Sequence, residues 1–171
     1  MRRQFLVTAL SLALYAAAAP ASAQIPPRRT LAAKSTGAVR VLVADPALAG
    51  GGVVGAGAQV GTALRVAMAR LGGKRLEVIS WESVLALLER SGYPVDAPLT
   101  STAAGAIAAQ LQARVFVTGT LEPTETGRFK LTAHVGAAGR DPVEVSLAQE
   151  EGQDLAAFGA AAAAAIEGAL P

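Results

Sequence analysis

Cysteine is absent from this chain of 171 residues, histidine occurs once, and aromatic residues make up only 4% of it. Without cysteine the chain can form neither a disulfide scaffold nor a thiolate zinc site, and it has no cysteine nucleophile. One histidine cannot build a histidine metal cluster, and seven scattered aromatic side chains are too few to stack on nucleic-acid bases. We therefore expect no metal, no other cofactor and no nucleic-acid partner.

Charged residues are also scarce, at 16% of the chain against 52% hydrophobic residues. A disordered chain would need the opposite balance, so the composition indicates a folded protein. Its length suits one domain of ordinary size rather than two. Alanine supplies much of the hydrophobic fraction, and the core must therefore be built largely from small side chains.

The longest apolar run stands near the amino terminus. Two arginines precede the apolar segment 5–19, and the small residues Ala21 and Ala23 follow it at the spacing that signal peptidase recognises. We predict a secretory signal peptide over residues 1–23, cleaved after Ala23 or a neighbouring residue so that Gln24 begins the mature chain. An uncleaved anchor helix is the alternative, but the apolar run is short for a membrane span.

The export route is open between two systems. Arg2 and Arg3 partly match a twin-arginine signal, yet two arginines are equally ordinary in a Sec signal, which we favour. No later apolar stretch is long enough to cross a bilayer. We expect a soluble periplasmic protein that meets the membrane only through its transient signal peptide.

The basic character of the chain belongs to its first residues. The whole chain has 15 basic and 13 acidic residues, a net charge of +2. Residues 24–37 are polar and rich in proline, and we predict an extended linker there. Without the signal peptide the two counts are equal, and without the linker's Arg28, Arg29 and Lys34 the domain over residues 38–170 has a net charge of −3.

The spacing of apolar residues in that single domain predicts nine elements in the order β-α-β-α-α-β-β-β-α. The expected strands span residues 39–44, 76–79, 115–121, 128–135 and 143–147, and the expected helices begin near residues 60, 81, 102 and 154. Residues 47–58 are expected to form a glycine-rich loop. The result is an α/β (α+β) fold: a mixed sheet of about five strands with an antiparallel meander, packed by about four helices.

The strand expected at 128–135 has one apolar and one polar side. Its odd-numbered residues are apolar, and its even-numbered residues are Arg128, Lys130, Thr132 and His134. The next strand alternates in the same way and adds Glu144. Because alternate side chains of a strand point to opposite faces, these five polar residues are candidates for a partner-binding surface.

Asp45 follows the first strand directly and precedes the glycine-rich loop 47–58. Ligands of open α/β sheets bind at that end of the strands, so Asp45 with Gly50, Gly52 and Gly55 is an alternative ligand site. The three glycines fit the dinucleotide pattern G-x-G-x-x-G, but they stand too far from the strand, and no acidic residue ends the next one. A turn-forming Asp-Pro and a plain glycine loop are the structural interpretations.

The middle and end of the domain resemble the amino-terminal domain of TolB and the core of CsgG-type curli-secretion lipoproteins. The resemblance is carried by residues 81–90, 92–93, 102–114, 115–121 and 128–135, with Gly119 and Thr120 matching a glycine-threonine hairpin. It implies a non-enzymatic envelope domain that binds other proteins or assembles. The chain has neither the propeller of TolB nor the cysteine that anchors a lipoprotein.

Two functions follow from these observations. We favour an exported, non-enzymatic domain that binds an unidentified envelope protein or associates with itself. A serine protease triad would need His134, and no G-x-S-x-G motif accompanies it. The alternative is a small-molecule-binding or enzymatic α/β domain that uses Asp45 and the loop 47–58.

Overall fold

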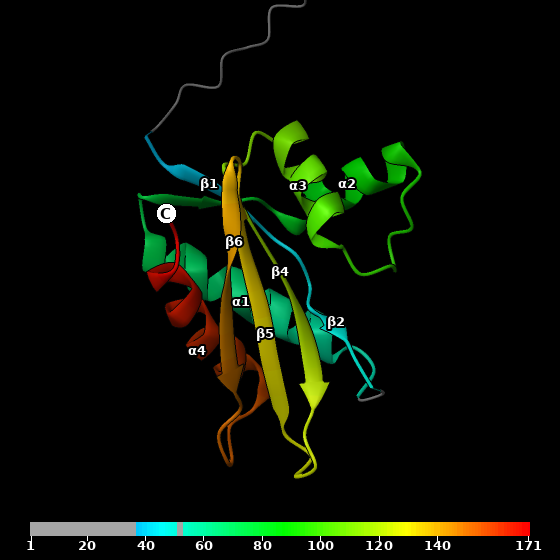
Figure 1. Ribbon diagram of the computed structural model, residues 1–171, viewed down its shortest axis with the longest axis vertical. Helices are drawn as coiled ribbons and strands as arrows, with labels where there is room; N and C mark the ends of the chain where they lie inside the picture. The colour runs from blue at the N-terminus through cyan, green and yellow to red at the C-terminus, as the bar shows by residue number, and fades with distance from the viewer. Residues whose placement is uncertain (1–36, 51–52) are drawn as a thin grey trace, which may run out of the picture. The chain divides into compact units, whose positions relative to one another are not determined.

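The computed structural model describes residues 37–50 and 53–171 (Figure 1). The predicted signal peptide 1–23 with its cleavage residues Ala21, Ala23 and Gln24, nearly all of the predicted linker, and Gly52 lie outside the described residues. No helix among the described residues is long and apolar enough to cross a membrane.

The sheet is mixed, as the sequence predicts. Its main strands are β1 (Val39–Val43), β3 (Leu76–Val78), β4 (Val115–Pro123), β5 (Phe129–Ala137) and β6 (Arg140–Ala148). They lie in the order β3-β1-β4-β5-β6, with β1 parallel to β3 and β4, and with β4, β5 and β6 antiparallel. The expected meander of the last three strands is therefore confirmed, and β6 forms one edge of the sheet.

Within the described part of the chain, four helices cover the sheet from both sides: α1 (Ala56–Gly72), α2 (Trp81–Ser91), α3 (Ser101–Gln110) and α4 (Leu155–Gly168). Helices α1 and α4 lie together on one face, while α2 and α3 lie on the other near one end of the sheet (Figure 1). Alternation along β1 supplies both cores, since Val41 and Val43 pack on the α1–α4 side and Leu42 packs on the α2–α3 side.

The helix ends follow from local chemistry. Ser80, Thr100 and Asp154 each accept a hydrogen bond from a backbone N–H in the first turn of α2, α3 and α4. Helix α2 ends at Gly92, which has the left-handed φ of 71° that glycine adopts freely. Helix α3 is capped by Leu111, and the next residue, Gln112, takes the left-handed conformation with a φ of 56°, which is costly for a residue with a side chain.

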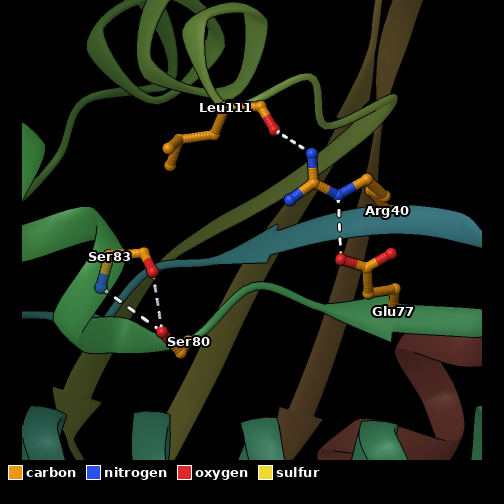
Figure 2. A network of polar contacts seen from close by, with 5 residues as sticks. All are labelled: Arg40, Glu77, Ser80, Ser83 and Leu111. Atoms are coloured by element: carbon orange, nitrogen blue, oxygen red, sulfur yellow. Dashed lines mark hydrogen bonds and ion pairs between the residues drawn. The ribbon is translucent and has the colours of Figure 1, made fainter. Parts of the chain in front are cut away.

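Arg40 connects β1 to two other elements (Figure 2). Its Nε donates to Glu77 Oε1 of β3 at 3.0 Å, and its Nη1 donates to the carbonyl of Leu111 at 2.6 Å. That carbonyl lies at the carboxyl end of α3, where helical carbonyls lack partners within the helix. Figure 2 also shows the cap of α2, where Ser80 Oγ accepts from the backbone N–H of Ser83.

The prediction of a loop over residues 47–58 is wrong at both of its boundaries. Ala47 and Leu48 form a short strand, β2, which pairs in parallel with Thr120 and Leu121 of β4. Helix α1 begins at Ala56, before the expected start near residue 60, because Ala56 is buried one turn before Val60 on the same helical face. The pairing with β4 joins segments about seventy residues apart, so local patterns do not indicate it.

The second hairpin is also tighter than expected. The sequence predicts a turn over residues 136–142, whereas β5 continues to Ala137 and β6 begins at Arg140, which leaves a two-residue turn. Gly139, the second turn residue, has a left-handed φ of 75°, which glycine adopts without strain. The polar start of β6 can remain in the strand because an edge strand is exposed and tolerates charge and proline.

Candidate functional site

The polar side of β5 is accessible, as its sequence pattern suggests. Phe129, Leu131, Ala133 and Val135 are buried in the core on the α1–α4 side. The intervening residues point to the opposite face, where Lys130 is exposed and Thr132 and His134 are partly exposed. This face of β5 is therefore available to a partner.

Strand register extends these residues into rows across three strands. Lys130 lies opposite Glu122 of β4 and Ala148 of β6, Thr132 lies opposite Thr120 and Ser146, and His134 lies opposite Thr118 and Glu144. We call the accessible polar members of these rows the open face: Thr120, Glu122, Lys130, Thr132, His134, Glu144 and Ser146. The sequence pattern missed Thr120, Glu122 and Ser146, which the alternation along β4 and β6 could have identified.

The open face ends where α3 packs on the sheet. Thr118 is only 4% exposed, and its Oγ1 lies 3.2 Å from Ser101 Oγ at the start of α3. Phe116 continues the same side of β4 beneath α3 and covers Gly136 of β5, where a Cβ would overlap its ring. Helices α2 and α3 thus protect one end of this side and leave the remainder uncovered.

The charged residues of the open face form no ion pair with another described residue. Three ion pairs occur among the described residues, and all three lie elsewhere: Arg40–Glu77, Arg65–Asp45 and Arg75–Glu167. Cross-strand neighbours such as Lys130 and Glu122 are thus close in register without a direct ion pair. Their charged groups can reorient toward a partner at little cost in internal contacts.

Arg128 differs from the other candidate residues. Strand β5 begins at Phe129, so Arg128 lies in the turn between β4 and β5, and its Nε donates to Thr126 Oγ1 at 3.0 Å. The structure therefore brings Lys130, Thr132, His134 and Glu144 together on the open face and places Arg128 in the adjoining turn.

Asp45, the centre of the alternative site, binds a residue of its own chain. Arg65 Nη1 of α1 donates to Asp45 Oδ1 at 2.7 Å and to the carbonyl of Val43 at 3.2 Å. The Arg65 guanidinium also lies over the Trp81 ring, with its Cζ 4.7 Å from the ring centroid. This cluster joins the end of β1 to α1 and α2, which gives Asp45 a structural role.

Burial raises the pKa of the Asp45 carboxyl above its ordinary value of 3.8, because the charged form loses hydration. The hydrogen bond from Arg65 and its positive charge act in the opposite direction and reduce the rise. A carboxyl that is partly dehydrated and already paired is a weak ligand for a further cation.

The glycines near Asp45 serve close packing. A Cβ at Gly61 would overlap Asp45 Oδ1, and a Cβ at Gly57 would overlap the carbonyl oxygen of Pro46. Gly55 caps α1 with a φ of 86°, and Gly50 lies beside Pro123. The sequence pattern emphasised Gly50 and Gly55, yet the two helical glycines make the tightest contacts with the strand end.

The geometry of a dinucleotide site is not formed. In that fold the strand turns directly into the helix, so that the glycines bring the pyrophosphate to the helix start. Here β1 ends at Val43 and α1 begins at Ala56, with β2 between them. A pocket of about 350 Å³ nevertheless lies there, and Asp45, Gly55, Trp81 and Asp96 contribute to its lining. Within residues 37–50 and 53–171, no three histidine, cysteine or acidic residues are grouped to hold a metal ion.

Comparison with known proteins supports the fold. No protein-family model and no curated protein matches the sequence. The LpoB C-terminal domain from Escherichia coli is similar in structure, with a TM-score of 0.56 and 16% identity over 68% of this chain and 85% of that chain. The corresponding domain from Salmonella enterica has a TM-score of 0.53 and 15% identity over 70% and 87%.

A lipoprotein, GNA1162 from Neisseria meningitidis, is also similar, with a TM-score of 0.50 and 12% identity over 78% of this chain and 99% of that chain. At identities this low, the likeness shows a shared fold alone. The resemblance to the TolB and CsgG modules stays a prediction. The mixed sheet with helices on both faces is thus an architecture that other bacterial proteins share, at least one of them a lipoprotein.

Proposed function

We propose that this chain is an exported domain of the cell envelope, resident in the periplasm, that binds another protein through its open face and catalyses no reaction. Three features support the proposal: the signal-like sequence of residues 1–23, a fold that a known lipoprotein shares, and an accessible polar sheet surface.

The observation that carries the proposal is the uneven cover of the sheet. Helices α1 and α4 cover one face, whereas α2 and α3 leave the outer strands of the other face open. The open face offers opposite charges and hydroxyls in rows at fixed strand spacing, which suits recognition of a complementary protein surface. The uncovered edge strand β6 borders it and could extend the contact by strand pairing.

The test is site-specific photocrosslinking in the native envelope. A photoreactive phenylalanine analogue replaces Thr132 on the open face, and the matched control replaces the exposed Ala161 of α4. We expect a discrete crosslinked adduct from position 132 and none from position 161. Adding Lys130→Glu should abolish the adduct, while Lys74→Glu, which reverses an exposed lysine outside the open face, should preserve it.

Folding must be checked beside the crosslink. Lys130→Glu places two acidic residues opposite each other across β4 and β5, which costs about 0.2–1 kcal/mol and leaves the domain folded. Thermal melting and circular dichroism verify this. The proposal fails if folded Lys130→Glu protein retains the adduct, or if position 161 gives the same adduct as position 132.

The pocket beside Asp45 favours a second function, the binding or conversion of a small molecule. Its test is stabilisation of the purified protein in a thermal-shift screen of small amines, with Asp96→Asn as the variant because Asp96 has no role in the Arg65 cluster. Stabilisation that Asp96→Asn abolishes, in protein whose position-132 adduct is absent, would favour this second function over the first.

A further inference from the structure

Segments distant in sequence meet at the end of the sheet where β1 begins. The start of β1, the junction of α3 and β4, the turn between β5 and β6, and the carboxyl terminus gather there (Figure 1). They enclose a pocket of about 530 Å³, larger than the pocket beside Asp45. Neither motif nor periodicity in the sequence indicates this pocket.

Two arginines line the pocket, Arg114 before β4 and Arg140 at the start of β6. The backbone N–H of Arg114 donates to the carbonyl of Arg40 at 2.9 Å, and Arg140 pairs with Ala137 beyond an irregularity in the strand register. Both residues are exposed, and neither takes part in any of the three ion pairs among the described residues. Their backbones are therefore held by hydrogen bonds or strand pairing, while neither guanidinium forms an ion pair with another described residue.

The surroundings combine this charge with apolar walls. Val39, Val115 and Ala137 line the pocket and also pack against the core on the α1–α4 side. Asp141 follows Arg140 directly but is not among the residues that line the pocket. The terminal Pro171 contributes to the rim. Among the described residues, the side chains that line this pocket include two arginines and no acidic residue, although the side chains of the domain sum to a net charge of −3.

We propose that this pocket binds an organic oxyanion, whose carboxylate or phosphate group is held by Arg114 and Arg140 and whose short apolar body contacts the walls. Guanidinium groups bind such oxyanions through charge-assisted, often bidentate, hydrogen bonds. The pocket lies at the opposite end of the meander from the Glu122–Lys130 row, so this inference is independent of the partner proposed for the open face.

The test is a titration of isotope-labelled protein followed by amide NMR. Acetate, butyrate and inorganic phosphate are the probes, and sodium chloride at matched ionic strength is the reference. We expect amide shifts at Arg114 and across residues 137–140 with butyrate or phosphate and none with chloride. Butyrate should bind at least threefold more tightly than acetate if its longer chain reaches the apolar walls.

Variants then assign the binding to the two arginines. Arg114→Gln and Arg140→Gln should each weaken binding at least tenfold, because each removes a charge-assisted contact. Arg90→Gln removes the same charge from α2, where Arg90 Nε donates to the carbonyl of Ala86, and should leave binding unchanged. Binding of phosphate alone would identify a phosphorylated ligand, and binding of butyrate alone a carboxylic acid.

Two results would overturn the inference. The first is an absence of amide shifts at the pocket with every probe. The second is equal weakening by Arg90→Gln, which would show general charge screening instead of a site. Lys130→Glu should leave the titration unchanged, so failure here and failure of the open-face proposal are distinguishable.

Discussion

Gly61→Ala tests the packing of α1 against the end of β1. A methyl group at this position would overlap Asp45 Oδ1 and would lie 3.0 Å from Asp45 Cα, which is tighter than nine in ten Cβ contacts in proteins. Rotation of the Asp45 side chain alone cannot relieve the clash, because the backbone is also in the way. Helix α1 and β1 must therefore separate, and the 2.7 Å contact between Arg65 and Asp45 must lengthen.

The size of the effect follows from three opposing contributions. Alanine is better than glycine inside a helix by about 1 kcal/mol, which favours the variant. Overpacking in a well-packed core costs about 1–3 kcal/mol. A hydrogen bond between charged groups contributes about 1.5–3 kcal/mol, of which only part is lost at this partly exposed pair. We expect the free energy of unfolding to fall by about 2 kcal/mol.

Urea unfolding followed by circular dichroism measures this change, and Gly105→Ala of α3 is the matched control. A Cβ at Gly105 would lie 3.4 Å from Phe116 Cε1, an ordinary contact, so helix propensity alone should raise the free energy of unfolding by about 0.5–1 kcal/mol. Opposite signs for the two variants support the close approach at Gly61. A Gly61→Ala protein as stable as the parent, alongside a stabilised Gly105→Ala protein, would refute it.

Three further predictions concern the backbone and the ion pairs. Gln112→Gly should raise the free energy of unfolding by about 1 kcal/mol in urea titrations by relieving the left-handed φ of 56° at the end of α3, and a loss of stability would contradict this. NMR titration should give Asp45 a pKa above 3.8, and Arg65→Gln should raise that pKa further. Because the pKa is raised in the folded state, the stability linked to Asp45 is greatest below pH 3.8 and declines as the pH rises through the folded-state pKa. Asp45→Asn should remove this pH dependence. Arg40→Leu should lower the free energy of unfolding by about 1–2 kcal/mol in thermal or urea unfolding, because it removes the hydrogen bond to the Leu111 carbonyl at the end of α3. Glu77→Gln should lower it by less than about 1 kcal/mol, because the Arg40–Glu77 ion pair is exposed. Equal effects of the two variants would argue against a stabilising contact at the helix end.

Local patterns predict most elements of this fold because their physical basis is local. The alternation along β5 separates buried Leu131 from exposed Lys130, and Ser80 marks the start of α2 with its side-chain cap. The ends of elements are predicted less well where a distant segment decides them. β2 exists because β4 supplies its hydrogen bonds, and α1 begins at Ala56 because the core buries that residue.

The candidate sites also combine properties that the local sequence predicts with properties that distant segments decide. The polar character of Lys130, Thr132, His134 and Glu144 can be read along the chain, since side chains on one strand face recur at every second residue. The sequence pattern does not reveal whether that face is covered, because the helices that cover part of it come from other regions of the chain. The sequence also singled out Asp45 as a candidate residue for binding a ligand, and only the folded chain shows that the Asp45 carboxylate is already hydrogen-bonded to Arg65.

By itself, the sequence determined the mixed fold, its meander and the polar side of β5, because hydrophobic period and helix caps act within a few residues. It also carries the prediction of export, in the order of charge, apolar run and small residues over positions 1–23. Tertiary structure decided which polar residues are accessible, which charges are already paired, and that Arg114 and Arg140 share one pocket. These properties depend on distances between segments far apart in the chain, and packing of the sheet against its helices sets those distances.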